Sequence, residues 1–289
     1  MPQGVRVSEV TLSSCPLYGR PTNFVRNASM TTNRRSFLKT SLTSAAALST
    51  GAAWLPSLAR ADGHIAADKY VIGGADISIH PVAHASFVMQ TPNAVIYVDP
   101  VGGAEKYASL PKAQLIMLTH EHGDHFDIET LQALLGEETT LITNPSVFEK
   151  LPAEMQELAT AIGNGDNTSY GELSVDAIPA YNLNADRLKY HPKGRDNGYV
   201  LTIGGERVYI AGDTEAVPEM RELEDIKLAF VPMNLPYTMG IEQAAEGVLD
   251  FAPSVVYPYH HKGSDINAFE KLVNAGSADI QVVKAAWYS

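Results

Sequence analysis

The chain has 289 residues, of which 45% are hydrophobic, enough for one or two folded domains. Cys15 is its single cysteine, which excludes a disulfide framework and a cysteine-based metal site. The formal net charge is −12. Residues 1–61 contain seven Lys or Arg and one acidic residue, which leaves 14 basic and 32 acidic residues in 62–289. A body this acidic lacks the basic surface that nucleic acid requires, so we expect no nucleic-acid partner.

The N-terminal segment carries the features of an export signal. Arg34 and Arg35 precede residues 40–59, which contain no charged side chain, and Ala59-Arg60-Ala61 has the small residues of a signal-peptidase site. The paired arginines resemble a twin-arginine signal, which implies a periplasmic or secreted protein. Ser, Thr, Gly and Pro dilute the uncharged stretch, which favours a cleaved signal over a permanent membrane span.

We therefore predict two parts of the chain. Residues 1–61 form an unstructured leader and signal peptide, and its true start is either Met1 or Met30. Residues 62–289 form the mature domain, for which we expect no stable membrane insertion once the signal is removed.

The first part of the mature domain predicts a strand meander. Apolar and alternating residues place strands at 77–82, 86–90 and 94–98. His84 lies between the first two strands, and Asp99 ends the third. Residues 105–112 predict a short helix.

Three histidines and an aspartate then fall within six residues: His120, His122, Asp124 and His125. Residues 114–118 before them are apolar and predict a buried strand, and apolar spacing predicts a helix at 128–135. The cluster therefore lies between a strand end and a helix start, at the open edge of a sheet. Neutral imidazoles and a carboxylate are the ligands of a zinc-type divalent metal. Crowding them into a solvated loop without a metal is disfavoured, because so many polar groups are costly to assemble.

The rest of the chain predicts strands that deliver further polar residues. Apolar patterns place strands at 139–143, 170–180, 198–203, 207–211, 228–232, 254–259 and 280–285, and helices at 146–151, 152–160, 238–251 and 265–274. Asp213 follows one of these strands within Ala211-Gly212-Asp213-Thr214, and His260 follows another within Pro258-Tyr259-His260. A long loop between 181 and 197 contains Asn182, His191, Lys193 and Arg195.

The HxHxDH spacing resembles that of the metallo-β-lactamase superfamily, and the residues around Asp213 and His260 match its later motifs. This resemblance implies an α/β fold, a four-layer αβ/βα sandwich, with two divalent metal ions. It implies that His120 and His122 bind the first metal, that Asp124, His125 and His260 bind the second, and that Asp213 bridges them. Zinc is the default, and manganese or iron stays open because no thiolate selects a soft metal.

The sequence departs from the family where a third ligand of the first metal is expected. Many relatives have a histidine after the strand at 170–180, but this chain has Ala180-Tyr181-Asn182. A loop that folds back could bring His191 to the metal. The alternatives are that Asn182 or water fills the position, or that His191 binds substrate. Lys193 and Arg195 either hold an anionic substrate group or are solvated loop charges.

Two further roles come from the resemblance. The segment around His84 resembles the "GHAS" segment of the lactonase-like branch, which implies that His84 faces the pocket; otherwise it is an ordinary surface or core histidine. Asp99 matches an aspartate that braces the histidine loop from behind, and the alternative is a plain turn residue.

The activity implied is hydrolysis of a small-molecule ester, lactone or phosphodiester by metal-activated hydroxide, with Asp124 as a proton shuttle. The chain most resembles the lactonase-like and N-acyl-phosphatidylethanolamine-phospholipase-like branch, and a true β-lactamase is disfavoured. The alternative is a non-catalytic metal-binding or scaffold protein on the same fold, against which the complete ligand set argues. The sequence leaves the oligomeric state open.

Overall fold

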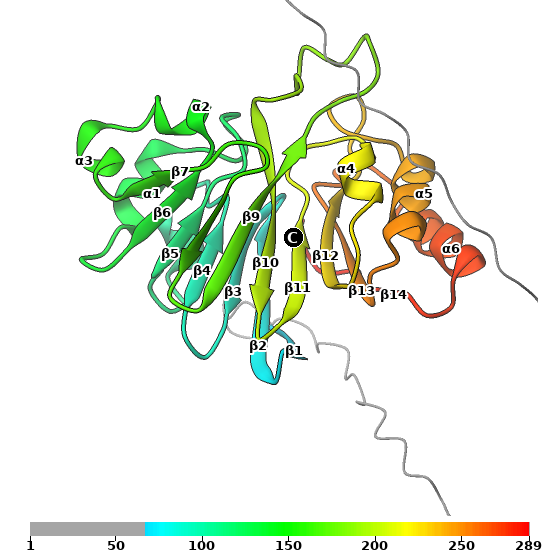
Figure 1. Cartoon of the computed structure of the whole chain (residues 1–289), viewed down its shortest axis with the longest axis horizontal. Helices are drawn as coiled ribbons and strands as arrows, with labels where there is room; N and C mark the ends of the chain where they lie inside the picture. The colour runs from blue at the N-terminus through cyan, green and yellow to red at the C-terminus, as the bar shows by residue number, and fades with distance from the viewer. Residues whose placement is uncertain (1–66, 289) are drawn as a thin grey trace, which may run out of the picture. The chain divides into compact units, whose positions relative to one another are not determined.

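The computed structural model describes residues 67–288, which form two seven-stranded sheets (Figure 1). The strands of the first sheet are hydrogen-bonded in chain order: β1 (Asp68–Ile72), β2 (Ala75–Ala83), β3 (Ser86–Gln90), β4 (Val95–Val98), β5 (Leu115–Met117), β6 (Thr140–Thr143) and β7 (Ala159–Ala161). The second sheet has β8 (Asn167–Tyr170), β9 (Leu173–Ala180), β10 (Asp196–Ile203), β11 (Glu206–Ile210), β12 (Ile226–Pro232), β13 (Val255–Tyr259) and β14 (Gln281–Val282). The predicted leader and signal peptide lie outside the described residues.

The two sheets repeat one mixed pattern. Strands β1 to β4 are antiparallel and β4 to β7 are parallel. In the second sheet β8 to β11 are antiparallel and β11 to β14 are parallel. Each parallel half requires crossover connections, and these carry the helices.

The helices cover the outer faces of the sheets, as Figure 1 shows. The first sheet is covered by η1 (Ala104–Tyr107), α1 (Ile128–Leu134), α2 (Pro145–Phe148) and α3 (Ala153–Gln156), and the second by α4 (Pro218–Arg221), α5 (Ile241–Phe251) and α6 (Ile266–Gly276). Helix, sheet, sheet and helix make four layers, which confirms the predicted αβ/βα sandwich. No helix within residues 67–288 is long and apolar enough to span a bilayer.

The central core lies between the sheets, and strand alternation builds it. Phe87 and Met89 of β3 point into this core, whereas Val88 between them packs with the helices outside. Phe230 of β12 stacks on Phe87, with ring centroids 4.1 Å apart and planes 16° from parallel. Strands buried on both faces explain why the sequence shows continuous apolar runs rather than strict alternation.

Some predicted elements differ from those observed. The helix predicted at 152–160 ends at Gln156, and residues 159–161 pair with β6 as strand β7. The helix predicted at 105–112 is a single 3₁₀ turn that ends at Tyr107, four residues before Pro111. The helix predicted from 238 begins at Ile241, after Gly240 as its N-cap. The strand predicted at 170–180 is β9 together with the end of β8, and residues 171 and 172 form the turn between them. Strand β1, most of β8 and helix α4 were not predicted.

Candidate metal centre

The site residues follow strand ends at one edge of the two sheets. Asp99 follows β4, His120 follows β5 by three residues, Asp213 follows β11 and His260 follows β13. Asp99 and His260 have positive φ angles of 43° and 44°, which side chains other than glycine rarely adopt. Backbone of this kind persists where its surroundings hold it, and it often marks a functional site.

Asp99 holds the histidine loop from behind. Its carboxylate is fully buried and accepts hydrogen bonds from Thr119 N at 2.8 Å and Thr119 Oγ1 at 2.6 Å. It also accepts one from His125 Nδ1 at 2.7 Å. Asp127 then caps helix α1 by accepting from the backbone N–H groups of Glu129 and Thr130, which fixes where the loop ends.

These contacts assign the tautomers of the histidines. Because a carboxylate only accepts, the proton of His125 lies on Nδ1. The Thr119 hydroxyl donates to Asp99, so it accepts from His120 Nδ1, which lies 3.0 Å away. In its neutral form each of these imidazoles therefore directs an unprotonated Nε2 into the site, which is the form that binds a metal.

The loop after β9 folds back and brings His191 to the other histidines. The backbone N–H of Asn182 donates to the carbonyl of His191 at 2.9 Å. The Nδ1 of His191 donates to Asp196 Oδ2 at 2.9 Å. The ring centroid of His191 lies 5.0 Å from that of His120 and 4.8 Å from that of His122.

Ligand-type atoms gather in groups whose members lie within 4.8 Å of one another. One group contains His120, His122 and His191, and a second contains His84, Asp124, His125 and His260. Asp213 lies between them: its Oδ1 is 3.3 Å from His125 Nε2, and its Oδ2 is 3.2 Å from His260 Nε2 and 3.4 Å from His191 Nε2.

The donor set fits a divalent cation. Buried atoms without a hydrogen-bond partner include the Nε2 atoms of His120, His125 and His260 and the Oδ1 of Asp213. Lone pairs that face a buried carboxylate repel it unless a cation lies between them, and unpaired buried polar atoms are costly. The cluster of His and Asp side chains is thus able to bind metal.

The pKa directions follow from burial and from neighbouring charges. Burial, with the nearby His125, lowers the pKa of His120 well below its usual value, so the imidazole is neutral and able to ligate. Burial raises the pKa of Asp213, but His260 and His125 overcome this and hold it well below its usual value. Burial also raises the pKa of Asp124, but hydrogen bonds from His260 and His84 overcome this effect and lower the pKa.

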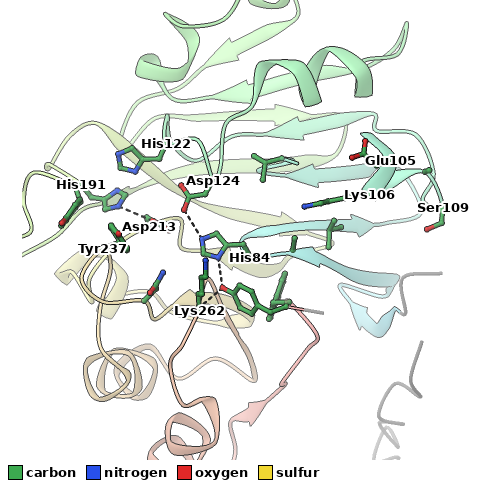
Figure 2. Close-up of a pocket in the computed structure, with 18 residues that line it drawn as sticks. His84, Glu105, Lys106, Ser109, His122, Asp124, His191, Asp213, Tyr237 and Lys262 are labelled. Atoms are coloured by element: carbon green, nitrogen blue, oxygen red, sulfur yellow. Dashed lines mark hydrogen bonds and ion pairs between the residues drawn. The ribbon is translucent and has the colours of Figure 1, made fainter. Parts of the chain in front are cut away.

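His84 lies inside the site. Its Nε2 is 3.1 Å from Asp124 Oδ2, and its Nδ1 is 2.8 Å from the hydroxyl of Tyr288 (Figure 2). Its ring lies 3.8 Å from that of His260. The backbone of His84 also accepts from His260 N and donates to Trp287 O, which ties the β2–β3 turn to the end of the chain.

Asn182, Lys193 and Arg195 belong neither to the ligand groups nor to the pocket lining formed by the described residues. The side-chain amide of Asn182 donates to the carbonyls of Arg187 and Tyr237. The Lys193 ammonium donates to Glu219 at 2.9 Å. Arg195 donates to Asp196 at 2.7 Å, so it holds the carboxylate that orients His191.

Other residues of the site were not predicted. Asp196 orients His191, and Thr119 orients His120. Of these two residues, only Thr119 could have been suspected from the sequence, because it directly precedes the histidine motif. The pocket has a volume of about 1230 Å³, and Lys106, Lys262 and Tyr237 line it together with Asp124 and Asp213 (Figure 2). No sequence pattern marks these three residues, because they come from η1 and two separate loops.

Comparison with known proteins identifies the family of this chain. A family model described as a β-lactamase superfamily domain matches residues 78–260. A UPF0173 metal-dependent hydrolase from Pyrococcus furiosus is 28% identical over 208 residues, which cover 66% of this chain and 90% of that protein. A similar protein from Thermococcus kodakarensis is 25% identical over 210 residues, 68% of this chain and 92% of its own length.

Solved structures share the fold. The crystal structure of a protein from Parabacteroides distasonis, described as a metal-dependent hydrolase, has 38% identity and a TM-score of 0.71, and the match covers 78% of this chain and all of that one. The metallo hydrolase Igni18 from Ignicoccus hospitalis matches with a TM-score of 0.59 at 24% identity over 72% of this chain and 95% of its own, which supports the fold alone. With the matching domain and the convergent His and Asp cluster together, this chain belongs to the β-lactamase superfamily and has the metallo-β-lactamase fold.

Proposed function

We propose that this protein is a dinuclear metal-dependent hydrolase of an ester, lactone or phosphodiester. The observation that carries the proposal is the convergence of buried Nε2 atoms without a hydrogen-bond partner on the carboxylate of Asp213. The names of its relatives, metal-dependent hydrolases, support the same class of reaction.

In this proposal His120, His122 and His191 hold the first metal ion, and Asp124, His125 and His260 hold the second. Asp213 lies between the two groups: its Oδ1 is near His125, and its Oδ2 is near both His260 and His191. Zinc is the default for imidazole and carboxylate ligands, with manganese and iron as alternatives. Asp99, Thr119 and Asp196 fix the orientation of the ligand rings from behind.

Divalent ions at such a site lower the pKa of water and polarise a carbonyl or phosphoryl oxygen. The protein residues position this chemistry. Asp124 has a half-exposed side chain in the pocket and stays ionised, so it can accept a proton from the reacting water. His84 donates to Asp124 and limits its rotation, and Tyr288 in turn holds His84.

The deciding experiment is metal analysis of purified mature protein, paired with a substrate panel. We expect close to two metal ions per chain. We also expect turnover of at least one class among aryl esters, lactones and phosphodiesters, abolished by a chelator and restored by zinc or manganese. Hydrolysis of β-lactams should be the weakest activity. A protein without bound metal would contradict the site, and a fully loaded but inactive protein would favour the scaffold alternative.

We also propose that the protein acts after export through the twin-arginine route, on the basis of Arg34, Arg35 and the uncharged stretch that follows them. That route transports folded proteins, which is compatible with a metal site loaded before transport.

A further inference from the structure

The cationic side chains around the pocket divide into two kinds. Three are neutralised by carboxylates: Arg187 by Glu215, Lys193 by Glu219, and Arg195 by Asp196. Lys106 and Lys262 line the pocket, and neither has an ion pair with any carboxylate among residues 67–288. The two lysines that line the pocket are thus free to pair with an anionic ligand.

Lys106 is held against the pocket wall by the loop after β4. Its stem and ammonium lie over Gly102, at the position that a Cβ of that residue would occupy. The backbone N–H of Gly103 is bound by Thr130 Oγ1 at 2.8 Å, which anchors this loop to helix α1. Figure 2 shows the Lys106 nitrogen directed toward the space beside Asp124, while the Glu105 carboxylate points another way.

Lys262 enters the pocket from the opposite sheet. It follows β13 by three residues, and its backbone N–H donates to the hydroxyl of Tyr288 at 2.9 Å. That hydroxyl also contacts His84 Nδ1, so Lys262 is two hydrogen bonds from the residue that touches Asp124. Its position is therefore fixed relative to the candidate metal ligands.

The charges of the pocket then favour an anion. With metal ions bound, the carboxylates of Asp124 and Asp213 are compensated. The remaining charged side chains of the lining are Glu105, Lys106 and Lys262, with a positive balance. Ammonium groups without an internal partner are available for charge-assisted hydrogen bonds to a ligand.

An aromatic pair forms the other wall. Tyr190 and Tyr237 line the pocket with ring centroids 5.1 Å apart at an angle of 70°. Figure 2 places Tyr237 on the far side of Asp124 and His84 from Lys106. A substrate with a flat apolar part can pack on this pair while its charged end reaches the lysines.

We propose that the substrate of this site is an ester that carries a second, anionic group, a carboxylate or a phosphate, which Lys106 and Lys262 bind. This inference rests on the proposed hydrolase function and narrows its substrate class. The reaction itself is ester hydrolysis, in which water is added across the acyl–oxygen bond and the anionic group is unchanged.

The test uses two esters of one shape with and without a charge, 4-acetoxybenzoate and 4-acetoxybenzamide, with the metal-loaded protein. We expect a higher kcat/KM for the benzoate, mainly through KM. Lys106→Gln and Lys262→Gln should each lower the benzoate-to-benzamide ratio by about three- to tenfold, since charge-assisted contacts are strong but exposed ones are screened. Lys112→Gln, an exposed lysine outside the pocket, is the matched control and should keep the wild-type ratio.

Binding provides a second readout that does not need turnover. Calorimetry with 4-hydroxybenzoate, phenylphosphonate and 4-hydroxybenzamide should show that an anionic ligand binds more tightly than the neutral amide. The lysine variants should lose this difference. The anion that binds more tightly shows whether the site prefers a carboxylate or a phosphate-type group. An equal kcat/KM for the two esters in the wild type would overturn the anion preference. So would lysine variants that keep the wild-type benzoate-to-benzamide ratio. If the anion binds in a lysine-dependent way but the protein hydrolyses neither ester and no lactone or phosphodiester, the hydrolase function is contradicted and the anion preference stands.

Discussion

His191 donates from Nδ1 to Asp196 Oδ2 at 2.9 Å, and this contact turns its Nε2 toward Asp213 at 3.4 Å. We predict that His191→Ala lowers occupancy of the first metal site sharply and leaves the second nearly intact. The reason is that a catalytic site needs three protein ligands and an open position, and the variant leaves two. Metal content of the dialysed protein, measured by elemental analysis, checks this.

The control for this variant is His80→Gln, on strand β2 and outside the ligand groups, which should keep the wild-type metal content. If His191 instead binds substrate, the His191→Ala protein will hold its full metal content while KM rises. That result would remove His191 from the ligand set.

Asp213 is the carboxylate that both ligand groups share. We predict that Asp213→Ala loses at least one metal ion per chain and more than about 100-fold of the activity, because a ligand costs at least as much as its supporting contacts. Asp176→Asn, a change in strand β9 away from the site, is the control. Retention of both metals by Asp213→Ala would show that the assignment is wrong.

The export proposal has a direct test. Arg34→Lys combined with Arg35→Lys should leave the precursor in the cytoplasm, because the twin-arginine exporter reads that pair. Fractionation and immunoblotting measure the distribution, and Lys39→Arg serves as a control for a general charge effect. Normal periplasmic delivery of the double variant would point to another export route.

How much of the site the sequence predicted depends on how local its contacts are. His120, His122, Asp124 and His125 form one contiguous motif, so a short pattern finds them. The role of His191 stayed open because its position depends on the fold-back contact with Asn182 and on Asp196, which no short pattern encodes.

The same limit applies to the pocket lysines and to strand β7. Lys106 and Lys262 are 156 positions apart in the sequence, and they line the same pocket only because both sheets end at one edge. The apolar spacing predicted a helix that included residues 159 and 160. In the structure residues 159–161 form a strand instead, because Ala159 pairs with Leu141 of β6. Tertiary pairing overrides such weak local preferences.

The core between the sheets makes a prediction about stability. Phe230 is fully buried and stacks on Phe87 at 4.1 Å and on Tyr257 at 5.0 Å. Phe230→Ala should lower the free energy of unfolding by about 3–5 kcal/mol, because it removes buried apolar area and leaves a cavity. Urea unfolding measures this, and Val71→Ala, at a 62% exposed position, should change stability by less than about 0.5 kcal/mol.

A polar contact between the sheets lies outside the pocket lining. The hydroxyl of Tyr257 donates to Asp68 Oδ2 at 2.9 Å and also makes a very short hydrogen bond with the hydroxyl of Tyr70. Burial raises the pKa of Asp68, while the hydrogen bond from Tyr257 and the charge of His80 oppose the rise. The folded protein therefore holds a proton on Asp68 at a pH where the unfolded chain has released it.

This pKa shift predicts a pH-dependent difference between the wild type and Asp68→Asn. Below the unfolded pKa of 3.8 both side chains are neutral, and Asn can still accept from Tyr257. As pH rises through the raised pKa, the wild type must ionise a partly buried carboxyl and loses stability, whereas the variant does not. The free energy of unfolding of Asp68→Asn minus that of the wild type should therefore increase as the pH rises. Above the raised pKa this difference should stay constant. Urea unfolding of both proteins from pH 3.5 to 7 measures it, and a constant or opposite difference would show that Asp68 is not destabilised by burial.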